Sequence, residues 1–101
     1  MSIQNSEAIR AIEAQLKELD AVYKQAAEDL NTIRGTERVR QWKVRTTPVL
    51  AQHAGAEDAK RFGALHPGAS FTADLLEELS DEVELYREHV AAILAKLRKA
   101  E

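Results

Sequence analysis

The longest regular pattern in this 101-residue sequence is IRAIEAQLKELDAVYKQAAEDLNTI, residues 9–33. Its apolar positions are separated alternately by three and four residues. They are Ile9, Ile12, Leu16, Leu19, Tyr23, Ala26, Leu30 and Ile33. This spacing places them on one face of an α-helix, as in a coiled-coil heptad. We therefore predict a long helix over residues 6–34, ended by Gly35 and followed by Thr36 as the cap of the next helix.

A second pattern of the same kind occupies the C-terminal part of the chain. Its apolar positions are Leu76, Leu79, Val83, Tyr86, Val90, Ile93 and Leu97. Leu75, Ala91 and Leu94 widen this stripe, so the helix is expected to face more than one neighbour. The pattern predicts a helix over residues 71–100, capped by Ser70 or Thr72 after the turn at Pro67-Gly68.

Two shorter helices are expected between the long ones. The first spans residues 37–54, and its buried stripe is Val39, Trp42, Thr46, Val49 or Leu50, and His53. Pro48 lies inside it and is expected to kink the helix, or to divide it near Thr46-Thr47. Gly55 ends it, and a short helix over residues 56–64 follows, anchored by Ala59 and Phe62.

The composition agrees with an all-helical protein. Cysteine is absent, and four glycines and two prolines are too few for the many turns of a sandwich or barrel. Two helices of nearly 30 residues, each about 42 Å long, should pack along their lengths. The predicted fold is an all-α, antiparallel bundle of two long helices with a kinked middle helix and a short helix. It forms a single domain over residues 1–101.

Basic residues are concentrated at the start of the middle helix. They are Arg34, Arg38, Arg40, Lys43 and Arg45, with Glu37 as the one acid among them. One interpretation is that this face binds nucleic-acid phosphate while Trp42 stacks on a base. The other is that Trp42 is a core residue and the basic helix neutralises the acidic part of the last helix.

That acidic part contains seven carboxylates between residues 74 and 88. They are Asp74, Glu77, Glu78, Asp81, Glu82, Glu84 and Glu88. Four pairs of them lie four residues apart, where like charges repel in an isolated helix. A further interpretation is the helix dipole, which favours acids early in a helix and bases late.

No pattern of residues indicates chemistry. The sequence has no glycine-rich phosphate loop and no nucleophile motif. His53, His66 and His89 lie on different elements, and no carboxylate precedes a histidine as in di-iron bundles. We expect no catalytic residue, no metal, no cofactor and no enzyme activity. The N-terminus lacks signal-peptide features and no run could span a membrane, so the expected location is cytoplasmic.

The apolar stripes suggest a contact surface. One short helix cannot easily cover two helices about 42 Å long. We therefore expect apolar side chains near the free ends to be exposed and to contact a second copy or another protein, and these are Ile9, Ile12, Ile93 and Leu97. Exposed apolar stripes mark such interaction sites.

A family resemblance supports the same interpretation. RVRQWKVR, residues 38–45, continues to Leu50 and then to AKRF, residues 59–62. This segment resembles helical N-terminal regions that precede effector domains in bacterial anti-phage and conflict proteins, although no effector domain follows in this sequence. The resemblance implies a module for assembly or sensing. The predicted function is a non-enzymatic protein–protein interaction or oligomerisation module, and the resemblance implies a place in a bacterial defence or regulatory system. The alternative is a small nucleic-acid-binding protein.

Overall fold

The protein is described by a computed structural model that covers residues 3–67 and 75–99, with side chains from residue 6. Four α-helices pack compactly, and no strand occurs in these two ranges. The helices are α1 (Ile3–Asp29), α2 (Thr32–His53), α3 (Ala56–Gly63) and α4 (Leu75–Lys99). The all-α prediction is confirmed. The caps predicted at Ser70 and Thr72 lie outside the described residues.

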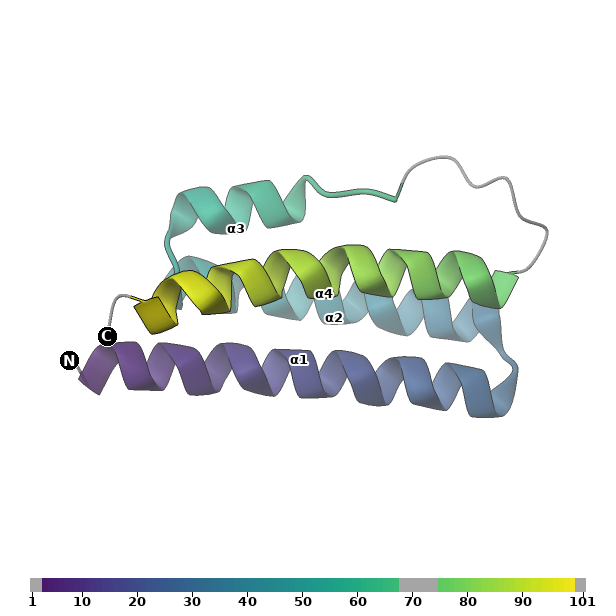
Figure 1. Cartoon of the computed structure of the whole chain (residues 1–101). Coiled ribbons are helices and arrows are strands. Elements are labelled where there is room, and N and C mark those ends of the chain that lie inside the picture. The colour runs from purple at the N-terminus through teal and green to yellow at the C-terminus, as the bar shows by residue number, and fades with distance from the viewer. Residues whose placement is uncertain (1–2, 68–74, 100–101) are drawn as a thin grey trace.

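The three long helices pack as a bundle in which each contacts the other two, and the short α3 lies on one side of it (Figure 1). α1 and α4 are antiparallel, as predicted, and α2 lies against both of them and runs in the same direction as α4. α3 folds back over α2 and α4 on the side away from α1. With 22 residues, α2 is nearly as long as its neighbours, so the bundle has three long helices where two were expected.

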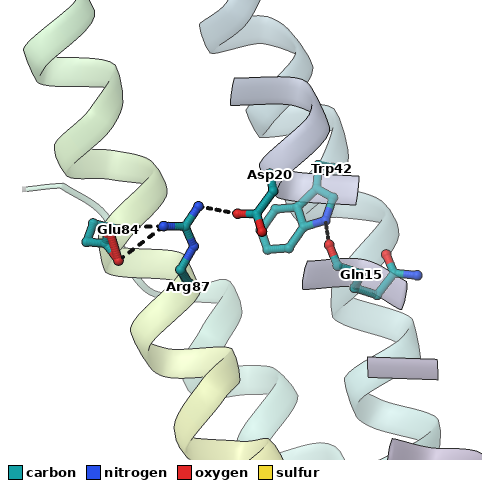
Figure 2. A network of polar contacts seen from close by, with 5 residues as sticks. All are labelled: Gln15, Asp20, Trp42, Glu84 and Arg87. Carbon is teal, nitrogen blue, oxygen red and sulfur yellow. Dashed lines mark hydrogen bonds and ion pairs between the residues drawn. The ribbon is translucent and has the colours of Figure 1, made fainter. Parts of the chain in front are cut away.

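Trp42 lies at the centre of the core. Its side chain is fully buried, and its indole Nε1–H donates a hydrogen bond of 2.7 Å to the backbone carbonyl of Gln15 on α1 (Figure 2). The rings of Phe62 on α3 and Tyr86 on α4 lie 5.8 and 6.2 Å from its ring. One side chain therefore contacts all the other helices, and the interpretation of Trp42 as a core residue is confirmed.

Ion pairs at the surface join α1 to α4. Arg87 on α4 binds Asp20 on α1 and, at 3.2 Å, Glu84 on its own helix (Figure 2). Arg98 on α4 binds Glu13 on α1 at 3.2 Å. These pairs are largely exposed, so each contributes less than about 1 kcal/mol, and they serve mainly to fix the register of the antiparallel pair.

The junction between α1 and α2 differs from the prediction. α1 ends at Asp29, and Leu30 adopts a φ of 55°. Asn31 then caps α2, since its side-chain oxygen accepts a hydrogen bond of 3.1 Å from the Arg34 backbone N–H. The predicted boundaries at Arg34, Gly35 and Thr36 are therefore wrong. The prediction failed because the regular apolar spacing continues in the sequence beyond the end of α1. Asn31, a preferred N-cap residue, already indicates that a new helix begins there.

Gly35 has a different role from the predicted one. It lies buried inside α2, where a Cβ atom would approach the Cβ of Ala26 to 2.6 Å and Cδ2 of Leu79 to 3.0 Å. The absence of a side chain lets α1 and α2 come close together at this level. Glycine is therefore required at position 35 by the close packing of α1 against α2, and not by the end of a helix.

Two further expectations need correction. α2 continues through Pro48, so the predicted division near Thr46-Thr47 is wrong. Pro48 and Val44, the residue four positions before it, both lie on the exposed side. Water can therefore satisfy the Val44 carbonyl that proline leaves without a donor. On α4, Leu94 is buried as expected, but Leu75 and Ala91 are exposed.

Gly35→Ala should destabilise the protein by about 1–3 kcal/mol, because the added methyl overpacks the α1–α2 contact by more than alanine gains in helix propensity. Thermal or urea unfolding followed by circular dichroism measures this. Gly63→Ala is the matched control, since the nearest atom to its Cβ is 3.9 Å away. If both variants are equally stable, the close approach at Gly35 does not limit packing.

Candidate functional site

A groove lies between α2 and α4. α3 covers only the half of these helices near the end of α2, where Lys96 contacts Asp58 at 3.4 Å. Towards the other end a groove of about 550 Å³ remains. Its lining residues are Thr32, Ile33, Thr36, Arg40, Pro67, Leu75, Glu78, Leu79, Asp81, Glu82 and Leu85. The groove combines an apolar floor with charges of both signs, as binding surfaces for proteins commonly do.

A polar cluster lies beside this groove. The hydroxyl of Tyr86 donates a hydrogen bond of 3.0 Å to the carboxylate of Glu82, a residue that is 6% exposed. Lys43 lies over the Tyr86 ring, 4.8 Å from its centre, and its ammonium donates to the backbone carbonyl of Leu65. Lys43 thereby ties the segment that follows α3 to α2. Together with Arg40, these residues line a second cavity of about 410 Å³.

The cluster shifts two pKa values. Burial raises the pKa of Tyr86 above its usual value of 10, and the Glu82 carboxylate and its hydrogen bond raise it further, while Arg40 lowers it. Burial lowers the pKa of Lys43 from 10.5, against the opposing attraction of Glu82. The hydroxyl, carboxylate and ammonium groups all have partners within the chain. Their arrangement stabilises the α2–α4 contact and holds the edge of the groove.

The structure divides the predicted basic face. Arg38 pairs with Asp29 at 3.9 Å and Arg45 pairs with Glu18, both on α1. Lys43 belongs to the cluster beside Tyr86. Arg34 and Arg40 are exposed.

The expectation that this helix neutralises α4 is therefore only partly right, because Arg38 and Arg45 compensate acids of α1. With Trp42 fully buried, the stacking contact on a nucleic-acid base is unavailable. Heptad spacing could not reveal which acids these arginines would reach, since that depends on how the helices are rotated about their axes.

The predicted oligomer contacts are not exposed at the surface. Ile9, Ile12 and Ile93 are buried inside the chain, and Leu97 is half-buried against the same core. The expected exposure at the free ends is wrong, because α1 and α4 cover one another there. The large apolar residues that are exposed among those described are Leu30 (78%), Ile33 (73%), Val44 (73%) and Leu75 (56%). Sequence reasoning assigned Leu30, Ile33 and Leu75 to buried stripes.

The described residues offer no obvious metal centre or membrane segment. Within them, no group of three or more histidine, aspartate or glutamate side chains could hold a metal ion. None of their helices is long and apolar enough to cross a membrane. His89 lies against the Phe62 ring, and its buried Nε2 has no hydrogen-bond partner among them.

Comparisons of the chain with models of known protein families, with curated proteins and with solved structures found no match.

Tyr86→Phe should destabilise the protein by about 1–2 kcal/mol, because the buried Glu82 carboxylate loses its donor while the aromatic packing is kept. Urea unfolding measures the change. Tyr23→Phe, at a half-buried position of α1 outside the cluster, should change stability by less than about 0.5 kcal/mol. Equal effects of the two substitutions would contradict a stabilising role for the Tyr86–Glu82 bond.

Alkaline pH provides an independent measurement. Above pH 10 the unfolded chain releases the Tyr86 proton, whereas the folded chain with its raised pKa retains it, so this group destabilises the fold as the pH rises. The lowered pKa of Lys43 changes the free energy of unfolding in the opposite direction, but Lys43 is present in both the wild type and Tyr86→Phe. The free energy of unfolding of Tyr86→Phe should therefore fall less steeply above pH 10 than that of the wild type. A parallel pH dependence would show that Tyr86 is not responsible.

Proposed function

We propose that this chain is a non-enzymatic helical module that mediates protein–protein contact, with self-association as the principal mode. The observation that carries the proposal is the exposure of Ile33 and Leu75 in the groove between α2 and α4. Burying large apolar side chains of this kind contributes about 1.5–3 kcal/mol each. Single exposed apolar residues are ordinary, but here they line one groove with charges at its edges.

The side chains inside the bundle serve packing and internal hydrogen bonds, which also supports a function located at the surface. The aromatic side chains Trp42, Phe62 and Tyr86 pack against one another and fill the centre of the bundle. The buried hydroxyl of Thr46 donates a hydrogen bond of 2.9 Å to the half-buried side chain of Gln15. Since these groups stabilise the fold, the surface groove between α2 and α4 is a better candidate for the functional site than the interior of the bundle.

Nucleic-acid binding is the alternative proposal, and its support is narrower. Arg34 and Arg40 are exposed and could contact phosphate, while Arg38 and Arg45 are paired with acids of α1. The net charge of −3 opposes general binding to a polyanion. The proposal of a protein–protein contact module also includes a cytoplasmic location, which the sequence suggests, and a part in bacterial defence or regulation, which the family resemblance suggests.

Sedimentation velocity and light scattering across the micromolar range test the self-association. We expect a mass above the 11.3 kDa of one chain, increasing reversibly with concentration. An association that buries apolar residues should persist at high salt, whereas one held only by surface charges should dissociate as these are screened. A mass of 11.3 kDa at every concentration would contradict the proposal.

A further inference from the structure

Leu30 has an unfavourable backbone conformation and a side chain that the chain itself does not bury. Its φ of 55° lies in the left-handed region, which glycine and asparagine adopt readily and leucine does not. Helices that end in this conformation usually place glycine there. At 78% exposure, the leucine side chain gains little from packing within the chain. Strained residues that persist often mark functional contacts, so this position indicates a role outside the single chain.

Two further exposed apolar residues lie at the same end of the bundle. Ile33 follows Leu30 at the start of α2, and Leu75 begins α4 at that end (Figure 1). Ile33 and Leu75 line the same groove. We call Leu30, Ile33 and Leu75 the end patch. It collects three of the four large apolar side chains that are exposed among the described residues.

The charges beside the end patch are of both signs. Arg40 of α2 lies on one side of the groove, and Glu78, Asp81 and Glu82 of α4 lie on the other. Of these acids Glu82 is buried and accepts the hydrogen bond of Tyr86. A surface that pairs with its own copy across a two-fold axis needs both members of each complementary pair on one chain. Arg40 and Asp81 give this surface one such pair.

We propose that the end patch binds the end patch of a second copy of this chain, with Arg40 of each copy facing Asp81 of the other. The inference rests on the proposed function and specifies its contact surface. Burial of Leu30 in this contact offsets the unfavourable conformation that the residue imposes on the free chain. The same leucine then lowers the stability of the monomer and raises the stability of the dimer.

Substitutions at Leu30 separate these two effects. Leu30→Asn removes the apolar side chain and suits the left-handed conformation, so it should raise the Tm of the monomer by about 4 °C while weakening association about tenfold or more. Leu30→Ala should weaken association to a similar degree without that gain in Tm. Val44→Ala is the matched control, because Val44 is similarly exposed but lies about three turns further along α2 than Ile33 of the end patch. It should leave association unchanged.

A charge exchange tests whether the partner is a second copy bound symmetrically. Arg40→Glu and Asp81→Lys should each weaken self-association, because each places like charges opposite one another in the dimer. An equimolar mixture of the two variants should associate again, since both contacts then join opposite charges. Circular dichroism shows whether each variant is folded. If Arg40→Glu does not fold, the Leu30 variants still test the end patch.

The outcomes are distinct. If the wild type associates but the Leu30 variants associate equally well, this surface is overturned while the proposed function stands. If the mixture fails to associate although each folded variant is weakened, the symmetric pairing is wrong. A wild type that is monomeric throughout overturns both proposals. Loss of association in Val44→Ala to the same extent as in Leu30→Ala would also contradict the assignment to the end patch.

Discussion

Trp42 joins α2 to each of the other three helices, through a hydrogen bond to the Gln15 carbonyl on α1 and ring contacts with Phe62 and Tyr86. The hydrogen bond satisfies a buried indole N–H that would otherwise destabilise the interior. Because the bond needs α1 and α2 at close range, it depends on the same approach that Gly35 permits beside Ala26. With α1 and α2 fixed in this way, α4 packs alongside both helices. α3 covers part of α2 and α4 on the side away from α1.

Much of this fold could be predicted from apolar spacing. On α4, the residues Leu79, Val83, Tyr86, Val90 and Ile93 are all buried as the pattern indicates. The same rule failed at Leu30 and Ile33, because spacing measures where a side chain would point if the helix continued. It contains no information on whether the helix does continue. The local signal at Asn31, a side chain that competes for backbone N–H groups, determined the boundary.

The candidate site was less predictable than the fold, for a different physical reason. Charge runs along a helix show how many ions are present but not which neighbour they face. Arg38 and Arg45 lie on the α1 side of α2, while Arg40 lies on the groove side. Arg38 and Arg40 are two residues apart and point to nearly opposite sides of α2, so a rotation of the helix by about half a turn would have exchanged these roles. The open groove itself depends on the shortness of α3, which was predicted, and on the boundary at Leu30, which was not.

The single tryptophan has a spectroscopic consequence. Because the Trp42 indole contacts Phe62 of α3 as well as α1 and α4, its fluorescence environment changes if α3 detaches alone, before the three long helices separate. A loss of ellipticity that lags behind the tryptophan signal would therefore identify a partly open form in which the short helix has come away. The protein thus contains its own intrinsic probe for local opening, with no label to be added.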